Sequence, residues 1–424
     1  MCLSKEIIIT LGLLLFAMVM FFTEIIPVWT TSIIVLLVFI VTGVLAPRDA
    51  FSGFIDSSVL LFMAVFIIGD AIFRTGLAKK IGDKVTHYAK TERQTIVLTM
   101  ISSGILSSFL SNTGTAAIFI PIIVGISKSS GYSSSRLLMP LVASLAMGGS
   151  LSLLGSPPNI IASSTLEHAG YESFAIFEFT PIALPIFIVG TIFYGLVGYK
   201  LLPDNKPQNN NTTFDEEYNF ENVPIWKMYL SIIVLIFTVL AMVFEDKIGI
   251  PFYVSAWIGA VFLVVTNTIS SIDAIKSIDM STILLFVGTL SIGQALQETG
   301  AGSLIARTVL SFAGSSPTVL LAMILLICIV LTNFMSNTAC AALMSGIGIS
   351  IATEIGADPR AILMAIVIGC SCSYATPIGS TPNTMIYNIG GYKFSDYTKF
   401  GLPLILINFI ISMILLPILF PFFP

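Results

Sequence analysis

Long apolar runs separated by short polar segments dominate this sequence of 424 residues. A helical run of 17 to 22 residues matches the hydrocarbon core of a bilayer, which is about 30 Å thick. Three such runs open each half of the chain, at residues 6–22, 28–46 and 57–73 and again at 228–244, 251–268 and 281–297. The pattern therefore predicts an all-α membrane protein that crosses the bilayer many times.

A second pattern follows in both halves. Two apolar segments flank a Ser-Asn-Thr sequence, a later segment is interrupted by Gly-Ser-x-Pro-Asn, and a last run closes the half. We expect a re-entrant hairpin around each Ser-Asn-Thr and a broken helix at each interruption. The hairpins are expected at 95–127 and 317–353, the broken helices at 136–166 and 360–389, and the closing runs at 180–201 and 402–420. The basic segment 74–93 is expected to be a loop.

Residues 224 positions apart match along nearly the whole chain. Pro27 matches Pro251, Arg136 matches Arg360, and the Gly-Ser-x-Pro-Asn sequence is repeated at this same spacing. The Ser-Asn-Thr sequences coincide after a slip of one residue. An ordered series of matches indicates an internal repeat. We predict a first repeat at 1–202, a polar linker at 203–225 and a second repeat at 226–424.

The loop charges indicate how the repeats are oriented. If each hairpin returns to the side it entered, each half crosses five times, and the second half is inverted relative to the first. With the N-terminus outside, 14 of the 19 Lys and Arg residues lie inside, as the positive-inside rule requires. We therefore predict two inverted repeats, each of five transmembrane helices plus one re-entrant hairpin, in the plasma membrane.

Composition agrees with a membrane protein. Hydrophobic residues make up 56% of the chain and charged residues 10%, too few to cover a soluble protein of this length. Run 6–22 lacks a basic n-region and a cleavage site, so we interpret it as a span and not as a signal peptide. The net charge of −4 indicates no partner class, and we expect no nucleic-acid partner.

Four of the five cysteines lie within or beside apolar runs of the second half. We interpret them as small packing residues, with a metal site as the less favoured alternative. These cysteines are Cys328, Cys340, Cys370 and Cys372.

The paired interruptions are the candidate site. Unsatisfied backbone groups are costly in hydrocarbon, so broken helices at membrane depth survive only beside protein or water. Paired breaks in inverted repeats indicate a transporter's central binding site. Serine and asparagine at the hairpin tips cap the returning helices, whose positive dipole ends attract anions. The carbonyls of Gly155 and Gly379 suit Na⁺, and Ser107 and Thr332, one turn before each tip, can add a hydroxyl.

Asp70 is the most deeply placed acid within a predicted span. Arg74 follows one turn later, so an i,i+4 ion pair is the favoured interpretation. A role in binding a coupling ion or proton is the alternative. The matching residue in the second half is Gln294, so this feature is not repeated.

The sequences SNTGTAAIFIPI from Ser111 and SNTACAALMSGI from Ser336, with the two Gly-Ser-x-Pro-Asn breaks, resemble the divalent anion/sodium symporter family of elevator-type transporters. The resemblance covers essentially the whole chain. It implies Na⁺ as coupling ion, no organic cofactor, a small dianionic substrate and a homodimer in the lipid bilayer. It also implies that 1–73 and 226–297 are mainly scaffold, while the hairpins and broken helices move.

The resemblance further implies three sets of ligands. One sodium site would be framed by Ser107, Ser111, Asn112 and Gly155, and the other by Thr332, Ser336, Asn337 and Gly379. The substrate would contact Asn112, Thr113, Asn337, Thr338, Ser380 and Thr381.

We therefore expect Na⁺-coupled symport of a C4-dicarboxylate or sulfate by an elevator mechanism. An arsenite or Na⁺/H⁺ antiporter of the same superfamily is the main alternative, and a passive channel is a lesser one. An intramembrane hydrolase is disfavoured because the chain has no His-Glu-x-x-His sequence and neither His87 nor His168 lies in a predicted span. We expect no enzymatic activity.

Overall fold

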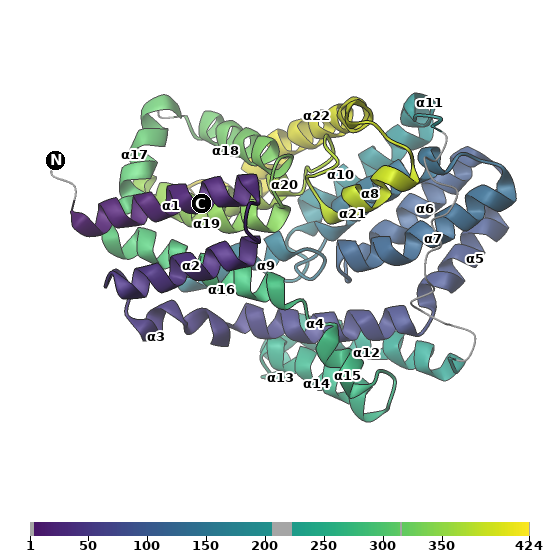
Figure 1. Ribbon diagram of the computed structural model, residues 1–424, viewed down its shortest axis with the longest axis horizontal. Coiled ribbons are helices and arrows are strands. Elements are labelled where there is room, and N and C mark those ends of the chain that lie inside the picture. The colour runs from purple at the N-terminus through teal and green to yellow at the C-terminus, as the bar shows by residue number, and fades with distance from the viewer. Residues whose placement is uncertain (1–3, 206–222, 314–315, 424) are drawn as a thin grey trace.

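The computed structural model describes residues 4–205, 223–313 and 316–423. These residues form helices and no strands, and most of the long helices run roughly along the long axis of the molecule (Figure 1). Eight helices among the described residues are long and apolar enough to cross a membrane. The prediction of an all-α membrane protein is confirmed.

The three opening runs of each half are helical. In order they are α1 (Lys5–Thr23), α2 (Val28–Val41) and α4 (Ser57–Arg74), then α12 (Ile225–Val243), α14 (Phe252–Val265) and α16 (Met280–Thr299). Runs 28–46 and 251–268 were expected to be longer helices, and this was wrong, because both α2 and α14 have only 14 residues. The chain then turns through Gly43 and Asn267, which have positive φ. Short helices follow at α3 (Pro47–Ala50), Ser52–Ile55 and α15 (Ser271–Lys276), and α13 (Glu245–Ile248) lies between α12 and α14.

Equivalent side chains start α4 and α16. The Asp56 carboxylate accepts hydrogen bonds from the backbone N–H groups of Ser58 and Val59. The Asp279 carboxylate does the same for the N–H groups of Ser281 and Thr282. An N-cap of this kind satisfies donors that the first helical turn leaves free.

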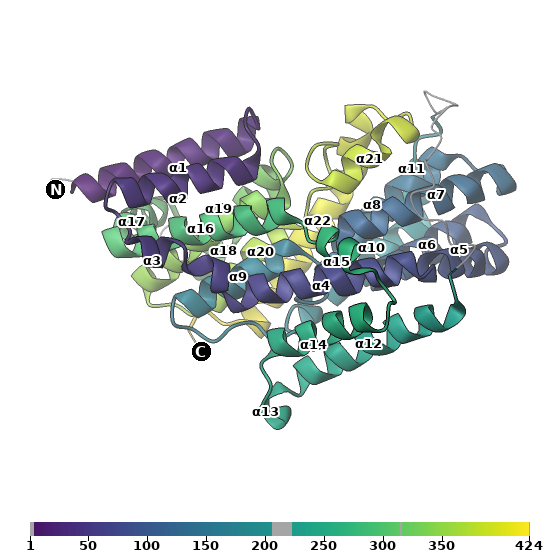
Figure 2. The ribbon, with the colours of Figure 1, turned by 60° about the horizontal axis from the view of Figure 1, so that its bottom comes forward.

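The opening helices of one half pack against opening helices of the other half. α2 packs against α16, and its counterpart α14 packs against α4. α12 and α14 form a pair on one side of α4, which Figure 2 shows below that helix. This exchange agrees with the predicted pair of repeats, whose inverted orientation and boundaries stay predictions.

Two further helices lie where only loops were expected. Segment 74–93 was predicted to be a loop, but α5 (Leu77–Tyr88) occupies most of it, and α17 (Ala301–Ala313) is its counterpart. In α5, Leu77, Ile81 and Val85 recur every four residues and pack toward the core. That spacing gives a helix one apolar face. α5 packs on α7 (Asn112–Ser130) and α17 packs on α19 (Asn337–Ile355).

The hairpins and broken helices interlock the two halves. The hairpins are α6 (Glu92–Ser107) with α7 and α18 (Pro317–Thr332) with α19. The broken helices are α8 (Ser134–Gly149) with α9 (Pro157–His168) and α20 (Pro359–Cys370) with α21 (Thr381–Ile389). α9 packs against α19 and α20, and α21 packs against α7 and α8. The second part of each broken helix therefore lies against the other half of the chain.

The closing helices show which faces meet lipid. They are α10 (Thr180–Phe193), which continues through a π-helical turn at Tyr194–Gly198 into α11 (Tyr199–Leu201), and α22 (Phe394–Leu419). On α22 the outward face is apolar and the buried face carries Asn408 and Ser412. The exposed residues of that face are Leu402, Leu406, Ile410, Ile414 and Ile418. An apolar outer face over a partly polar interior is typical of a membrane protein.

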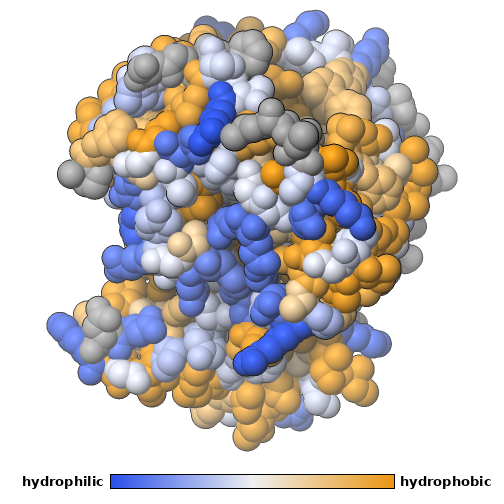
Figure 3. Space-filling model, turned by 90° about the vertical axis from the view of Figure 1, so that its left-hand side faces the viewer, coloured by the Kyte–Doolittle hydropathy of each residue, from blue (hydrophilic) through white to orange (hydrophobic). Residues whose placement is uncertain are grey.

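Figure 3 looks onto the end of the molecule where α1 and α17 lie. Hydrophilic residues gather over the middle of this face, and hydrophobic residues flank them. A polar end with apolar flanks agrees with helices that cross the bilayer along the long axis. The chain is a multi-pass membrane protein.

Helix α8 crosses α6 at unusually close range. A Cβ atom on Gly148 would lie 2.2 Å from the carbonyl oxygen and 2.6 Å from the Cα of Gly104. Gly148→Ala should therefore separate the two helices and lower stability by about 1–3 kcal/mol, the usual effect of overpacking. The thermal midpoint of detergent-purified protein measures this loss. Gly125→Ala on α7 is the control, because a Cβ there meets nothing within 4 Å. Equal midpoints for the two variants would contradict the prediction.

Candidate functional site

Four helices end and four begin around the predicted breaks. α6, α8, α18 and α20 end there, and α7, α9, α19 and α21 begin there. α9 contacts α20, and both lie near the middle of the long axis in Figure 1, whereas α21 contacts α7 and α8. The N-caps of the four starting helices are all serines: Ser111, Ser156, Ser336 and Ser380. In each half, carbonyl-rich and N–H-rich helix ends therefore lie beside each other at the break.

In the first half, hydrogen bonds close the hairpin tip. The buried Ser107 hydroxyl donates to Asn112 Oδ1 over 2.6 Å and to the Leu145 carbonyl over 3.2 Å. A Cβ atom on Gly155 would lie 2.7 Å from the carbonyl oxygen of Ser107 and 2.6 Å from that of Gly149. Two helix C-termini therefore direct carbonyls into the space that the missing side chain of Gly155 leaves. We call Ser107, Asn112, Gly149 and Gly155 the first cradle.

The second half repeats this arrangement. The Thr332 hydroxyl donates to Asn337 Oδ1 over 2.9 Å and to the Cys370 carbonyl over 2.6 Å. A Cβ atom on Gly379 would lie 2.9 Å from the Thr332 carbonyl oxygen. We call Thr332, Asn337 and Gly379, with the adjacent Ser373, the second cradle. Ser373 is buried, and its hydroxyl makes no hydrogen bond within the part of the chain that the structure describes.

Two of the predicted sodium ligands act as helix N-caps. The Ser111 hydroxyl accepts from the Gly114 N–H and the Ser336 hydroxyl from the Ala339 N–H, both over 3.2 Å. These serines cap α7 and α19, as the sequence predicted. Each cradle otherwise offers hydroxyl, amide and carbonyl oxygens, which are hard ligands suited to an alkali or alkaline-earth cation.

The predicted substrate residues divide into two kinds. Asn112 and Asn337 have their side-chain oxygens bound within the cradles, so their amide N–H groups are what remains for an anion. The other four are partly or fully exposed, and their side chains make no hydrogen bonds among the described residues: Thr113, Thr338, Ser380 and Thr381. Among those same residues, no hydrogen bond links one cradle to the other.

The sequence analysis missed two asparagines that span the breaks. The Asn159 amide donates to the carbonyls of Gly149, over 3.0 Å, and Ser152, over 2.6 Å. The Asn383 amide donates to the carbonyls of Ser373, over 2.6 Å, and Thr376, over 2.9 Å. Both asparagines are buried. Their recurrence in Gly-Ser-x-Pro-Asn was the signal that could have identified them.

Two hydroxyls attach the hairpins to the broken helices. Ser152 Oγ donates to the carbonyl of Ser108, and Thr376 Oγ1 donates to the carbonyl of Asn333. Since these residues again lie 224 and 225 positions apart, each hairpin tip is fixed to its own broken helix by the same contact.

Each hairpin borders a cavity against the helices of the opening runs. A cavity of about 150 Å³ is lined by residues including Ser111, Gly155 and Asp70, and one of about 240 Å³ by residues including Gly293, Gln294 and Gly346. Asp70 also pairs with Arg74, with 2.6 Å between the carboxylate oxygen and Nε. The predicted i,i+4 ion pair is confirmed.

A bundle of membrane-length helices, broken in equivalent places and polar at those breaks, defines a membrane transporter. The chain belongs to the citrate transporter family, whose model matches residues 18–248 and 239–423. The predicted resemblance to divalent anion/sodium symporters is thereby confirmed, as is the expectation that the protein is a transporter and not an enzyme.

The chain is similar to transporters over nearly its whole length. It is 23% identical to an uncharacterized transporter of Escherichia coli, with 99% of this chain and 100% of the relative covered. It is 22% identical to the sodium-dependent dicarboxylate transporter SdcS of Staphylococcus saprophyticus, with 99% and 87% covered. The solved YdaH transporter of Alcanivorax borkumensis superposes with a TM-score of 0.65 at 15% identity, over 87% of this chain and 86% of that one. The last likeness concerns the fold alone.

Asn383→Asp tests the asparagine that spans the second break. The carboxylate has nearly the same shape but cannot donate, so the carbonyls of Ser373 and Thr376 lose their partner. Each buried carbonyl left unpaired costs about 1–3 kcal/mol, so we expect a clearly lower thermal midpoint. Asn388→Asp on the exposed side of α21 is the matched control. A midpoint unchanged in both variants would show that Asn383 does not hold the break.

Proposed function

We propose that this transporter carries a small divalent anion, a C4-dicarboxylate or sulfate, together with Na⁺. The observation that supports this most is the pair of equivalent oxygen cradles, one at each hairpin tip. Relatives named sodium-dependent dicarboxylate transporters favour the dicarboxylate.

The cradles fit Na⁺ better than a more highly charged ion. None of the residues that form them carries a charge, so their oxygens are neutral dipoles. Neutral oxygens bind a monovalent cation without holding it so firmly that release becomes slow. Carbonyls at unwound helix ends are the usual sodium ligands of transporters with inverted repeats.

Two bound Na⁺ ions would also balance the charge of a divalent anion. An uncompensated charge is costly in a low-dielectric site, whereas two cations and one dianion are neutral together. The anion would lie against the N-termini of α7, α9, α19 and α21, where helix dipoles and free N–H groups favour negative charge. Thr113, Thr338, Ser380 and Thr381 would add hydroxyl donors. Binding without Arg or Lys allows the anion to be released once Na⁺ leaves.

An elevator movement is the proposed mechanism, with α1, α2, α4, α12, α14 and α16 as scaffold. At the boundary between scaffold helix α16 and hairpin helix α19, a Cβ on Gly346 would lie 3.1 Å from the Cα of Gly293. A glycine contact lets two helices approach closely without interdigitated side chains, and such a surface can slide. The proposal includes a homodimer, which the resemblance implies.

Thr332→Val tests the second cradle. Valine keeps the shape of threonine but removes its hydroxyl. A polar contact to a charged group, here the proposed Na⁺, contributes about 1.5–3 kcal/mol to binding. The Na⁺ concentration for half-maximal succinate uptake into proteoliposomes should therefore rise by roughly 10- to 100-fold. Ser107→Ala should act in the same direction at the first cradle. Thr353→Val is the control, because among the described residues that hydroxyl bonds to the Ile349 carbonyl of its own helix alone. If uptake of both succinate and sulfate were independent of the Na⁺ concentration, the proposed coupling would be refuted.

Asp70→Asn separates symport from antiport. An antiporter that exchanges Na⁺ or arsenite for protons needs an ionisable acid in the membrane, and Asp70 is the candidate. If Asp70 serves the ion pair with Arg74, the substitution should change Na⁺-driven uptake by no more than roughly tenfold, since asparagine still accepts a hydrogen bond from Arg74 Nε–H. Abolished uptake together with lost proton exchange in the same vesicles would favour the antiporter.

A further inference from the structure

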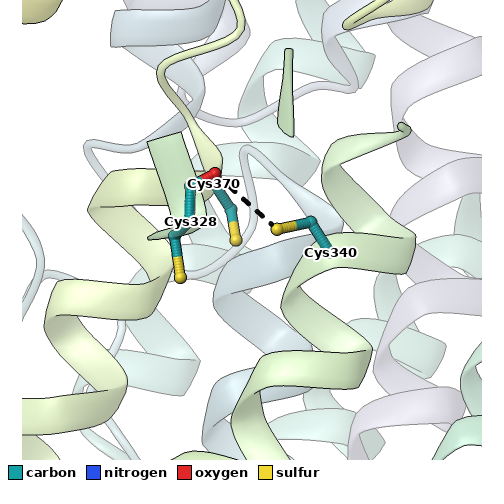
Figure 4. A group of neighbouring side chains, drawn as sticks. All are labelled: Cys328, Cys340 and Cys370. Atoms are coloured by element: carbon teal, nitrogen blue, oxygen red, sulfur yellow. Dashed lines mark hydrogen bonds between the residues drawn. The ribbon is translucent and has the colours of Figure 1, made fainter. Parts of the chain in front are cut away.

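Three cysteines from three helices meet behind the second cradle. Cys328 lies on α18, Cys340 on α19 and Cys370 at the end of α20, and their sulfur atoms all lie within 4.8 Å of one another. Each residue is fully buried. Figure 4 shows the three side chains converging between their helices, with Cys340 Sγ directed at the Cys328 carbonyl. We call these residues the thiol cluster.

The internal repeat does not require sulfur at these positions. The residues that match Cys328, Cys340 and Cys370 in the first half are Ser103, Thr115 and Ala146. The fold therefore requires small side chains here, and thiols satisfy that requirement in only one half. The thiol cluster is a property of this half's sequence and not of the architecture.

The ligand chemistry of the cluster is selective. Three sulfur atoms without a nearby imidazole or carboxylate in the described structure form a soft donor set, which prefers soft metal ions. Structural zinc sites usually have four ligands in a tetrahedron, whereas this cluster offers three. A larger and softer divalent ion suits it better.

Burial sets the charge that the occupied site can carry. A divalent ion that displaces two thiol protons forms two metal–thiolate bonds and releases two H⁺, while the third thiol donates a lone pair and keeps its proton. The resulting complex is neutral, as an apolar interior requires. A monovalent ion with three thiolates would leave a buried double negative charge.

We propose that Cys328, Cys340 and Cys370 form a binding site for a thiophilic divalent cation of the Cd²⁺ and Hg²⁺ class, whose occupancy blocks the second cradle. The blocking effect rests on the sodium function proposed above, and the binding itself does not.

The contacts between cluster and cradle give the reason for the block. Cys328 lies one turn before Thr332 on α18, and Cys340 lies three residues after Asn337 on α19. The carbonyl of Cys370 accepts the Thr332 hydroxyl over 2.6 Å. A metal that joins the three sulfurs would fix the relative positions of α18, α19 and α20, whose ends form the second cradle. If Na⁺ binding requires the ends of these helices to move, the bound metal would prevent Na⁺ binding.

The binding test uses the full-length chain in detergent, with Cd²⁺ alone as the probe. Thiolate coordination to Cd²⁺ gives an ultraviolet charge-transfer band, which should saturate at one ion per chain. The combined variant Cys328→Ser, Cys340→Ser and Cys370→Ser should lose the band. Cys372→Ser is the matched control, because Cys372 is equally buried on the same segment but lies outside the cluster and bonds to the Ile368 carbonyl. A band that persists in the combined variant, or is absent from the unsubstituted chain, would overturn the proposal.

Single substitutions test the cluster even if the combined variant does not fold. Cys328→Ala, Cys340→Ala and Cys370→Ala each remove one ligand, and each should weaken Cd²⁺ binding while the thermal midpoint without metal stays near that of Cys372→Ser. If all three bind Cd²⁺ as tightly as the unsubstituted chain, the cluster is not the site.

Uptake measurements test the effect on transport separately. Proteoliposomes preloaded with Cd²⁺ should lose Na⁺-dependent succinate uptake, recover it when a chelator is added, and show no loss when they contain the combined variant. A saturating absorbance band without inhibition would exclude the blocking effect but keep the site. Absence of Na⁺-dependent uptake before Cd²⁺ is added would instead reject the proposed symport and leave the absorbance result unaffected.

Discussion

The structure depends on one constraint, which is that a helix broken inside a membrane must satisfy its freed backbone groups within the protein. Asn159 and Asn383 meet this constraint, each with a single amide that donates to two carbonyls of its break. Because these carbonyls are satisfied locally, others at the ends of α6 and α18 can face the cradles without a permanent partner. The asparagines therefore stabilise the breaks and leave those carbonyls available to the proposed ions.

The placement of helix ends also explains how the proposed ion site could function without charged residues. Carbonyls of α6 and α8 converge beside Gly155, and the Thr332 carbonyl at the end of α18 lies beside Gly379, while helices that begin there present N–H groups. Partial charges of opposite sign thus lie side by side, so the proposed cations and anion would each have favourable helix ends. Formal charges in the same place would bind ions more firmly but would carry a large desolvation cost whenever the site is empty.

Much of this architecture could be predicted from the sequence, and the exceptions have physical causes. Ser107 and Asn112 lie five residues apart, so their pairing at a tip follows from local geometry, and the structure has the hydrogen bond. α5 was missed because a short helix with several lysines lies below the hydropathy that marks a span. A metal site at these cysteines was only the less favoured alternative, and their grouping was not predicted, because Cys328 and Cys370 are brought together by the packing of α18 on α20. Local motifs could be predicted from the sequence, whereas contacts between distant segments could not.

The two cradles have the same backbone plan but different side chains, and this difference has consequences. The first cradle has a Ser107 hydroxyl and no side chain at Gly149, where a Cβ would clash with Asn112 Oδ1 at 2.4 Å. The second has Thr332 in place of serine and the additional buried hydroxyl of Ser373. The second cradle thus has one more neutral oxygen to offer the proposed cation, and thiols lie behind it in place of Ser103 and Thr115. If the cradles hold the two proposed Na⁺ ions, unequal surroundings on an equal backbone imply unequal affinities. The two ions would then bind in a preferred order, and the anion would complete a site that the tighter ion has already ordered.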